Sequence, residues 1–259
     1  MKLLFLVSLL PLLNLSAHAT PFIVGGKTVS SNDFIAHSVV ALVSKSASGE
    51  ALCTASLVNT DLAITAAHCV TDASGNRINE LALVFARTLK GINPDKVRRV
   101  DQALVPADWN PAGSSEYNTG DVALIHFSGG LPEGYSPSDL LPFDQEFQKG
   151  DSVMLAGYGI TNAVSEAGAG ILRKREVKVL NPNYSDTEIE FDQSEGGGAC
   201  HGDSGGPAYF IINGHPYLFG ITSRGAGNCD IEVVYSKISS YSTWFQDAVT
   251  KIRRSYSSN

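Results

Sequence analysis

The segment Ala199–Pro207 constrains this chain more strongly than any other stretch, because it reads Ala-Cys-His-Gly-Asp-Ser-Gly-Gly-Pro. Glycine and proline inside a helix cost about 1 and 3 kcal/mol relative to alanine, so the segment cannot be a helix interior. It predicts a tight loop in which backbone N–H groups lie close to the Ser204 hydroxyl. A nucleophile beside preformed donors for a developing oxyanion needs this arrangement. The loop is therefore the first candidate for a catalytic site.

Short apolar runs separated by polar turns fill most of the remaining chain. Runs of this length, bounded by Gly, Ser and Asn, are typical of an all-β barrel or sandwich. The segment 131–150 is rich in Pro, Gly and acidic residues and predicts a linker, while apolar residues at helical spacing in Ser239–Arg253 predict a packing helix. The expected strands are Ser38–Val43, Ala51–Val58, Ala63–Ala67, Leu81–Phe85, Ser152–Gly157, Glu176–Leu180, Tyr209–Ile212, Leu218–Thr222 and Glu232–Tyr235.

The composition suits one globular unit, or two small domains that share an interface. The chain has 259 residues, of which 43% are hydrophobic and 17% are charged, so it can bury an ample core. The net charge of −7 argues against nucleic acid as a partner, because neutralising phosphates requires a basic face.

The N-terminal residues 1–19 read as a secretory signal peptide. One positive charge at Lys2 precedes a leucine-rich run, and Ala17–Ala19 supplies small residues spaced for cleavage. A transmembrane anchor is the competing interpretation, but Pro11 and Asn14 leave the apolar run shorter than the ~20 residues that a span needs. We therefore expect a secreted, extracellular protein, or a periplasmic one in a Gram-negative bacterium, without membrane contact once the signal is removed.

Four motifs occur in the order seen in one protein family: Ile23–Gly26, Thr65–Cys69, Asp121–Ile125 and Gly202–Pro207. Together they cover nearly the whole chain after residue 22, and the chain resembles the trypsin/chymotrypsin-like serine proteases (peptidase S1). The resemblance implies an all-β fold of two six-stranded antiparallel β-barrels with a C-terminal helix. A protease domain over 23–259 would then hold a first barrel at about 23–130, a linker at about 131–150, and a second barrel with the helix at about 151–254.

The same resemblance implies a catalytic triad. A serine hydroxyl is a poor nucleophile at neutral pH and needs a base, which in turn needs an orienting acceptor. By residue-wise match, Ser204 is the nucleophile, His68 the general base and then acid, and Asp121 the acceptor. The backbone N–H groups of Gly202 and Ser204 would form the oxyanion hole. The implied function is a serine endopeptidase that hydrolyses peptide bonds through an acyl-enzyme.

Other assignments of these residues were weighed. Asp101 and Asp108 compete with Asp121, but only Asp121 directly precedes a strong apolar strand. The residues around Ser204 also match Gly-x-Ser-x-Gly, the nucleophile motif of α/β-hydrolases. That fold requires an apolar strand before the serine, and an Asp and then a His after it. The preceding residues are glycine-rich and only His215 follows, so that interpretation fails. A catalytically inactive, protease-like binding protein remains the alternative from another functional class.

Four cysteines in an exported protein allow three disulfide connectivities. The family resemblance implies the pairs Cys53–Cys69 and Cys200–Cys229, each closing a short loop worth about 3 kcal/mol in the chain-entropy model. A zinc site was also weighed, because Cys69 and Cys200 each neighbour a histidine. Adjacent residues rarely point at one metal, and no Cys-x-x-Cys pair exists. We therefore expect no metal and no cofactor.

The resemblance also implies activation by proteolysis. A new N-terminus at Ile23 would fold inward and pair its ammonium with Asp203, a carboxylate that would be costly to bury unpaired. Residues 20–22 would then be a short propeptide, making the chain a zymogen. The bond to be cut follows Phe22, whereas many family members are activated after Arg or Lys. The alternative is that signal peptidase itself leaves Ile23 at the N-terminus.

Specificity in the family depends on the pocket for the side chain before the scissile bond. Its base is expected six residues before the serine, at Gly198, where trypsin-like enzymes carry an aspartate. Selectivity for Arg or Lys is therefore not expected. An uncharged pocket predicts a preference for small to medium apolar side chains, with discrimination of about 1–3 kcal/mol per methylene. The expected pocket residues are Gly198, Ala199, His201, Ser223, Arg224, Gly225 and Val233.

Two cationic or titratable residues leave a second specificity open. Arg224 replaces the usual tryptophan of the family, and His201 borders the pocket. Together they would favour an acidic side chain, so a protease preferring acidic residues is kept as an alternative. The expected partners are protein or peptide substrates and protein protease inhibitors, and the expected oligomeric state is a monomer.

Overall fold

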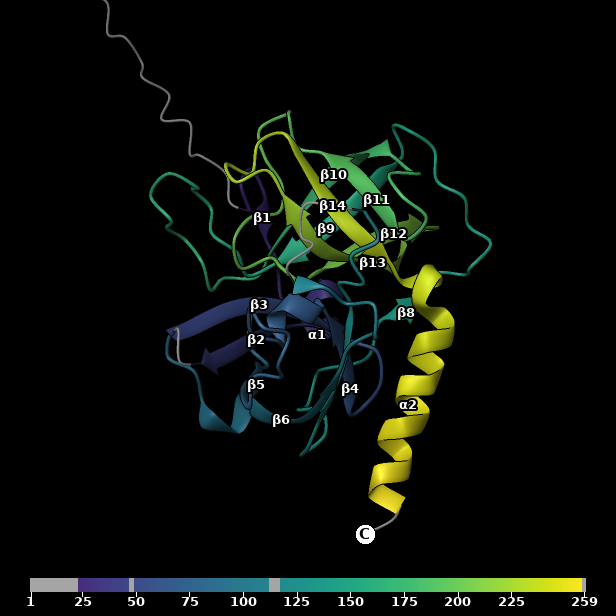
Figure 1. Cartoon of the computed structure of the whole chain (residues 1–259). Helices are drawn as coiled ribbons and strands as arrows, with labels where there is room; N and C mark the ends of the chain where they lie inside the picture. The colour runs from purple at the N-terminus through teal and green to yellow at the C-terminus, as the bar shows by residue number, and fades with distance from the viewer. Residues whose placement is uncertain (1–22, 47–48, 112–116, 258–259) are drawn as a thin grey trace, which may run out of the picture.

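A computed structural model describes residues 23–46, 49–111 and 117–257. Figure 1 shows two β-barrels stacked on one another, with the long helix α2 (Ser242–Ser257) running down the side of one of them. The signal peptide and the propeptide predicted for residues 1–22 lie outside the described residues.

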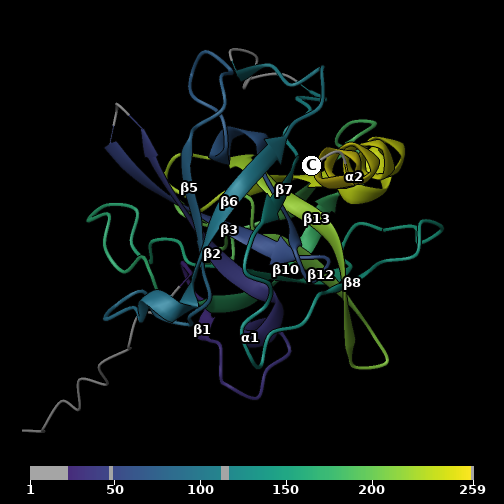
Figure 2. The same cartoon turned by 90° about the horizontal axis from the view of Figure 1, so that it is seen from below.

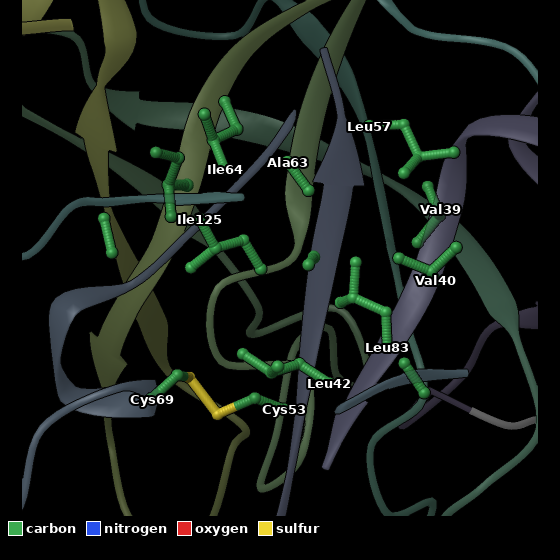
Figure 3. Packing of buried hydrophobic residues seen from close by; sticks show 14 of the residues in the cluster. Val39, Val40, Leu42, Cys53, Leu57, Ala63, Ile64, Cys69, Leu83 and Ile125 are labelled. Atoms are coloured by element: carbon green, nitrogen blue, oxygen red, sulfur yellow. A yellow bond between two sulfur atoms is a disulfide. The ribbon is translucent and has the colours of Figure 1, made fainter. Parts of the chain in front are cut away.

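The first barrel is a closed ring of six antiparallel strands. Its core is built from strand residues that alternate inward, such as Leu42, which stands opposite Cys53 on one side and Leu83 on the other. Figure 3 shows these side chains together with the disulfide between Cys53 and Cys69. In ring order the strands are β2 (Val39–Ser46), β3 (Gly49–Leu57), β4 (Leu62–Thr65), β7 (Ala123–Phe127), β6 (Val97–Leu104) and β5 (Glu80–Val84).

The second barrel also closes through six antiparallel strands, and it takes in two more at its margins. The short strand β1 (Lys27–Thr28) pairs with β10, and β8 (Asp139–Leu140) pairs in parallel with β13. The segment just after Ile23 therefore belongs to the sheet of the second barrel. In ring order the six strands are β9 (Ser152–Gly157), β10 (Arg173–Asn181), β11 (Glu188–Asp192), β14 (Glu232–Lys237), β13 (His215–Gly225) and β12 (Pro207–Ile212).

The remaining elements are helical. Two short turns, α1 (Ile35–Ser38) and η2 (Pro94–Lys96), lie in the first half, and η1 (Ala67–Cys69) carries a candidate site residue. The turn η4 (Ile238–Tyr241) leads directly into α2. None of the described helices has the length and apolar content needed to cross a membrane.

Helix α2 packs against the first barrel although it follows the second in sequence. Its inner face buries Ala248 and Ile252, and Arg253 forms an ion pair with Asp61 through two guanidinium nitrogens. Figure 2 views the helix end-on, beside the strands rather than across the barrel mouth. The helical spacing of apolar residues over Ser239–Arg253 thus reflects a packing helix, as predicted, because one face of α2 covers the hydrophobic core of the first barrel.

Two buried tyrosine hydroxyls make polar contacts between the barrels. The Tyr209 hydroxyl lies 3.2 Å from Ser38 Oγ and 3.0 Å from Ser138 Oγ. The Tyr158 hydroxyl donates to the carbonyl of Ala86 at 2.8 Å. These two tyrosines of the second barrel therefore satisfy polar groups of the first barrel and of the linker. The fold predicted from the family resemblance, two six-stranded antiparallel barrels and a C-terminal helix, is confirmed.

Candidate active site

Asp121 holds His68 by two contacts. Its Oδ2 lies 2.8 Å from His68 Nδ1, and its Oδ1 accepts a hydrogen bond of 3.0 Å from the His68 backbone N–H. Ser223 Oγ donates a third hydrogen bond, of 2.7 Å, to Asp121 Oδ2. The imidazole is thereby fixed in direction as well as position, because both its ring and its backbone are bound by one carboxylate.

The electrostatics of this pair suit a base. Burial raises the pKa of Asp121, but attraction to His68 and the hydrogen bonds from His68 and Ser223 outweigh it, so the pKa falls below its ordinary value. Burial lowers the pKa of His68, but the Asp121 carboxylate outweighs it by charge and hydrogen bonding, so the pKa rises above its ordinary value. The carboxylate stays ionised, and the imidazole is made a stronger proton acceptor.

Ser204 is linked to the segment that carries His68 by the first disulfide and a backbone contact. The Ser204 carbonyl accepts a hydrogen bond of 2.8 Å from the backbone N–H of Thr54, which follows Cys53 in the sequence. Cys53 is bonded to Cys69, which follows His68. Strand β3 therefore links the nucleophile loop to η1, and Ser204 is half-buried at the edge of a cavity of about 210 Å³.

The glycines of this loop are required by packing. Gly202 and Gly205 have φ angles of +96° and +76°, in the left-handed region that favours glycine. A Cβ at Gly205 would collide with the Thr65 hydroxyl, and a Cβ at Gly206 would lie 2.6 Å from the carbonyl oxygen of Ala156. The sequence-based expectation of a tight loop is matched by this geometry.

Asp203 is buried against the backbone of Gly157 and Gly159. It is 1% exposed, and its carboxylate accepts hydrogen bonds from the backbone N–H groups of Gly159 at 2.8 Å and Cys200 at 2.9 Å. A Cβ at Gly157 or Gly159 would collide with this carboxylate. Burial raises the pKa of Asp203 to about 7, against the lowering effect of the two N–H groups and of Arg173.

The start of the described chain is buried close to the nucleophile loop. Ile23 is 1% exposed and has a φ of 42°, unusual for a β-branched residue. Val24 packs against the cluster formed by Ile160, Cys200 and Cys229. The pairing of an Ile23 ammonium with Asp203 remains a prediction.

The cysteines pair as the family resemblance implies. Cys53 is bonded to Cys69, and Cys200 to Cys229. Each pair has a histidine nearby, His68 or His201, within a group that could in principle hold a metal ion. Because the sulfurs are consumed in disulfides, neither group offers a thiolate ligand.

The cavity of about 210 Å³ beside Ser204 collects most of the residues predicted for the substrate pocket. Gly198 does not line it: this glycine is buried, and a Cβ there would collide with the side chain of Gln193. Gln193 is 1% exposed, and sequence reasoning missed it because nothing in a single glutamine signals that it packs against a glycine five residues later. The lining residues are Ala199, Cys200, His201, Ser204, Thr222, Ser223, Arg224, Gly225, Ala226, Cys229 and Val233.

A second cavity has a volume of about 310 Å³ and is lined by His68 and Asp121. Trp109 and Pro111 give it an apolar wall, and Trp109 is held by a hydrogen bond of 3.0 Å from its Nε1 to Thr71 Oγ1. Ser223 and Arg224 also line it. Ser223 and Arg224 thus border both cavities.

Arg224 is an ion-paired residue, contrary to its expected role as an attracting cation in the wall. Its Nη1 donates a hydrogen bond of 2.6 Å to Glu188 Oε1, and its Nη2 donates one of 3.1 Å to Glu188 Oε2. Glu188 is fully buried. The positive charge that favoured an acidic substrate is therefore compensated within the protein, and sequence reasoning missed Glu188 because it is 36 residues away.

Comparison with known proteins agrees with this geometry. The chain is 27% identical over 217 residues to the fibrinolytic enzyme isozyme C of Lumbricus rubellus, covering 75% of this chain and 87% of that protein. It is 27% identical over 244 residues to the venom peptide isomerase heavy chain of Agelenopsis aperta, covering 86% and 98%. It is 26% identical over 230 residues to the CLIP domain-containing serine protease B4 of Anopheles gambiae, covering 76% and 62%.

A sequence model of the family described as Trypsin matches residues 23–245. The match takes in both barrels, both disulfides and all the residues of the candidate site. The chain therefore belongs to the Trypsin family and is a serine-type endopeptidase.

Proposed function

We propose that this chain is a secreted serine endopeptidase whose catalytic triad is Ser204, His68 and Asp121. The observation that carries the proposal is the double contact of Asp121 with the ring and backbone of His68, beside a half-buried serine at a cavity edge. A merely structural histidine has no need of a carboxylate that fixes both its tautomer and its direction.

The proposed reaction proceeds in two steps. Ser204 Oγ attacks the scissile carbonyl carbon while His68 Nε2 takes the hydroxyl proton, and the oxyanion is held by the N–H groups of Gly202 and Ser204. His68 then gives the proton to the leaving amine as the C–N bond breaks, which leaves an acyl-enzyme. A water molecule, deprotonated by His68, then attacks the ester carbon, and His68 returns the proton to Ser204 Oγ as the bond between the acyl carbon and Ser204 Oγ breaks, which releases the acid.

The proposed primary specificity is for small to medium apolar side chains. A cavity of about 210 Å³ beside Ser204, with Ala199, Gly225 and Val233 among its lining residues, supports this preference. The pairing of Arg224 with Glu188 removes the main argument for acidic side chains. His201 is the exposed residue that still favours that alternative.

The proposed activation is cleavage after Phe22, which frees the Ile23 amine. The support is the glycine-walled pocket of Asp203, a buried carboxylate whose pKa is raised to about 7. An ammonium in that pocket would favour the ionised carboxylate and order the nucleophile loop. The natural partners we expect are extracellular proteins or peptides, together with protein inhibitors, and the enzyme acts as a monomer.

The decisive experiment digests a diverse peptide mixture and identifies the cut sites by mass spectrometry. The protein beginning at Ile23 is compared with its Ser204→Ala variant, whose kcat is expected to be lower by about a millionfold, and with a chain beginning at Thr20. We expect cuts after apolar residues from the first protein only. A folded Ile23 protein that cuts nothing would favour the binding-only alternative, and predominant cuts after Glu would overturn the proposed specificity.

A further inference from the structure

Glu188, the first residue of β11, is a buried carboxylate at the junction of three segments. It is 0% exposed, and its Oε2 accepts hydrogen bonds from the Asn118 backbone N–H at 3.0 Å and Ser185 Oγ at 2.9 Å. Its Oε1 accepts from Thr119 Oγ1 at 3.3 Å. Both oxygens also bind the guanidinium of Arg224.

The first of these segments leads into the triad. Asn118 and Thr119 stand three and two positions before Asp121, and the intervening Gly120 has a φ of +68°. A Cβ at Gly120 would crowd the backbone of Trp109 at 3.0 Å. Glu188, in the second barrel, therefore anchors the loop of the first barrel that presents the triad carboxylate.

The second segment is the wall shared by the two cavities. β14 lies between β11 and β13 in the sheet, so the side chains of Glu188 and Arg224 meet across an intervening strand. Arg224 also lies over the ring of Tyr184, 5.8 Å from its centroid, and its Nη1 is 3.5 Å from Ser223 Oγ. The hydrogen-bonded path Glu188–Arg224–Ser223 thus ends at Asp121 Oδ2.

Both members of the Glu188–Arg224 pair are ionised. Burial raises the pKa of Glu188, but the hydrogen bonds and charge of Arg224, with the bonds from Asn118 and Ser185, outweigh it and leave the pKa below its ordinary value. From β14, Lys237 also faces Glu188. Removing one partner of such a pair would leave a charge of the other uncompensated beside the substrate.

We propose that Glu188 is a positioning residue that sets substrate specificity: it holds Arg224 as a charge-compensated wall between the two cavities, so that uncharged substrate side chains are accepted there. This inference rests on the proposed protease function of the same site. Without Glu188, the charge of Arg224 would be uncompensated at the wall of the two cavities and would select acidic side chains.

The test is a peptide library that carries Leu or Glu at each of the four positions before the scissile bond. In Glu188→Gln, which keeps the side-chain shape, the ratio of kcat/KM for Glu over Leu should rise on the order of tenfold at the positions that reach Arg224, a change equivalent to about 1.4 kcal/mol. The double variant Glu188→Gln/Arg224→Gln should return the ratio to the wild-type value. Glu190→Gln, on the same strand and outside both cavities, should leave it unchanged.

Active sites are counted in every variant with a fluorophosphonate probe that labels a reactive serine. Loss of kcat/KM by the same factor for every peptide in Glu188→Gln, at full labelling, would overturn the inference and leave Glu188 a structural residue. A wild-type protein that folds but neither labels nor cuts would overturn the proposed function as well.

A second variant covers a failure of Glu188→Gln to fold. Glu188→Ser removes the same carboxylate with a smaller side chain, so it also leaves the charge of Arg224 uncompensated. It should raise the Glu-to-Leu ratio in the same direction as Glu188→Gln. An unchanged ratio in a folded, fully labelled Glu188→Ser protein would contradict the inference.

Discussion

At the scale of single residues, the carboxylate of Asp121 performs several tasks at once. It is 2% exposed and accepts hydrogen bonds from His68 Nδ1, the His68 backbone and Ser223 Oγ. Its own carbonyl accepts from Ser236 Oγ at 3.1 Å. A side chain with this many donors around it stays ionised, and the imidazole beside it remains a strong base.

Asp121→Asn should therefore reduce kcat by about ten-thousand-fold, because an amide stabilises the wrong imidazole tautomer. The attraction that raises the pKa of His68 would also disappear, so the acid limb of the kcat/KM profile should move to lower pH. Rates measured from pH 5 to 9 check both effects. Asp101→Asn is the matched control, since Asp101 contacts His126 and Ser128 instead. Equal losses in the two variants would refute the assignment of Asp121.

At the scale of elements, the site is built where strands of the two barrels meet. The loop that carries Ser204 is held by two hydrogen bonds from Thr54 of β3. Thr54 Oγ1 donates to the carbonyl of Gly202 at 2.9 Å, and the Thr54 backbone N–H donates to the carbonyl of Ser204. The hydroxyl of Tyr209, on β12, is bound between Ser38 and Ser138. Each barrel thus binds polar groups that belong to another part of the chain.

Tyr209→Phe should lower the free energy of unfolding by about 1–3 kcal/mol, because two buried serine hydroxyls would lose their common partner. Urea unfolding at pH 7 measures the change. Tyr117→Phe is the comparison, since Tyr117 is 64% exposed and its change should stay within about 0.5 kcal/mol. Equal effects of the two substitutions would mean that the contact between barrels contributes nothing of its own.

At the scale of the whole molecule, stability depends on the protonation of Asp203. An ordinary aspartate carboxyl has a pKa of 3.8, and folding of the uncleaved chain raises the pKa of Asp203 to about 7. Between about pH 4 and pH 7 the folded state therefore holds a proton that the unfolded state has lost. The free energy of unfolding must then fall as pH rises through this window.

Asp203→Asn in the uncleaved Ser204→Ala chain should flatten that fall, because the amide does not titrate. Urea unfolding at one-unit steps from pH 4 to pH 8 compares the two chains. The same fall should be absent from a protein beginning at Ile23, whose ammonium would keep Asp203 ionised at lower pH. Parallel pH profiles of the three proteins would refute both the raised pKa and the proposed activation.

The tight loop around Ser204 and the all-β class were predictable because their causes are local, whereas the two six-stranded barrels were implied by the family resemblance. Gly202, Gly205 and Gly206 reflect tight backbone packing, and short apolar runs between polar turns predict strands whatever their partners. The family resemblance assigned His68, Asp121 and Ser204 to a triad. The structure brings His68 and Asp121 into contact, and the role of Ser204 stays a prediction.

Pairings across the sheets depended on register and could not be predicted. Arg224 is identifiable in the sequence as an unusual residue, but its partner Glu188 lies two strands away in the folded sheet. Gly198 was expected at the pocket base, yet Gln193 packs against it from the end of the preceding strand segment. Likewise, β1 joins the second barrel and α2 covers the first.

The sequence by itself therefore determined the all-β class, since turn chemistry and short apolar runs are properties of short segments, and its four motifs carried the family resemblance and the candidate catalytic residues. Only the tertiary structure decided the electrostatics of the substrate wall. The partly buried guanidinium of Arg224 attracts a charged substrate or presents a neutral surface according to whether a carboxylate stands opposite it, and that depends on which strands become neighbours.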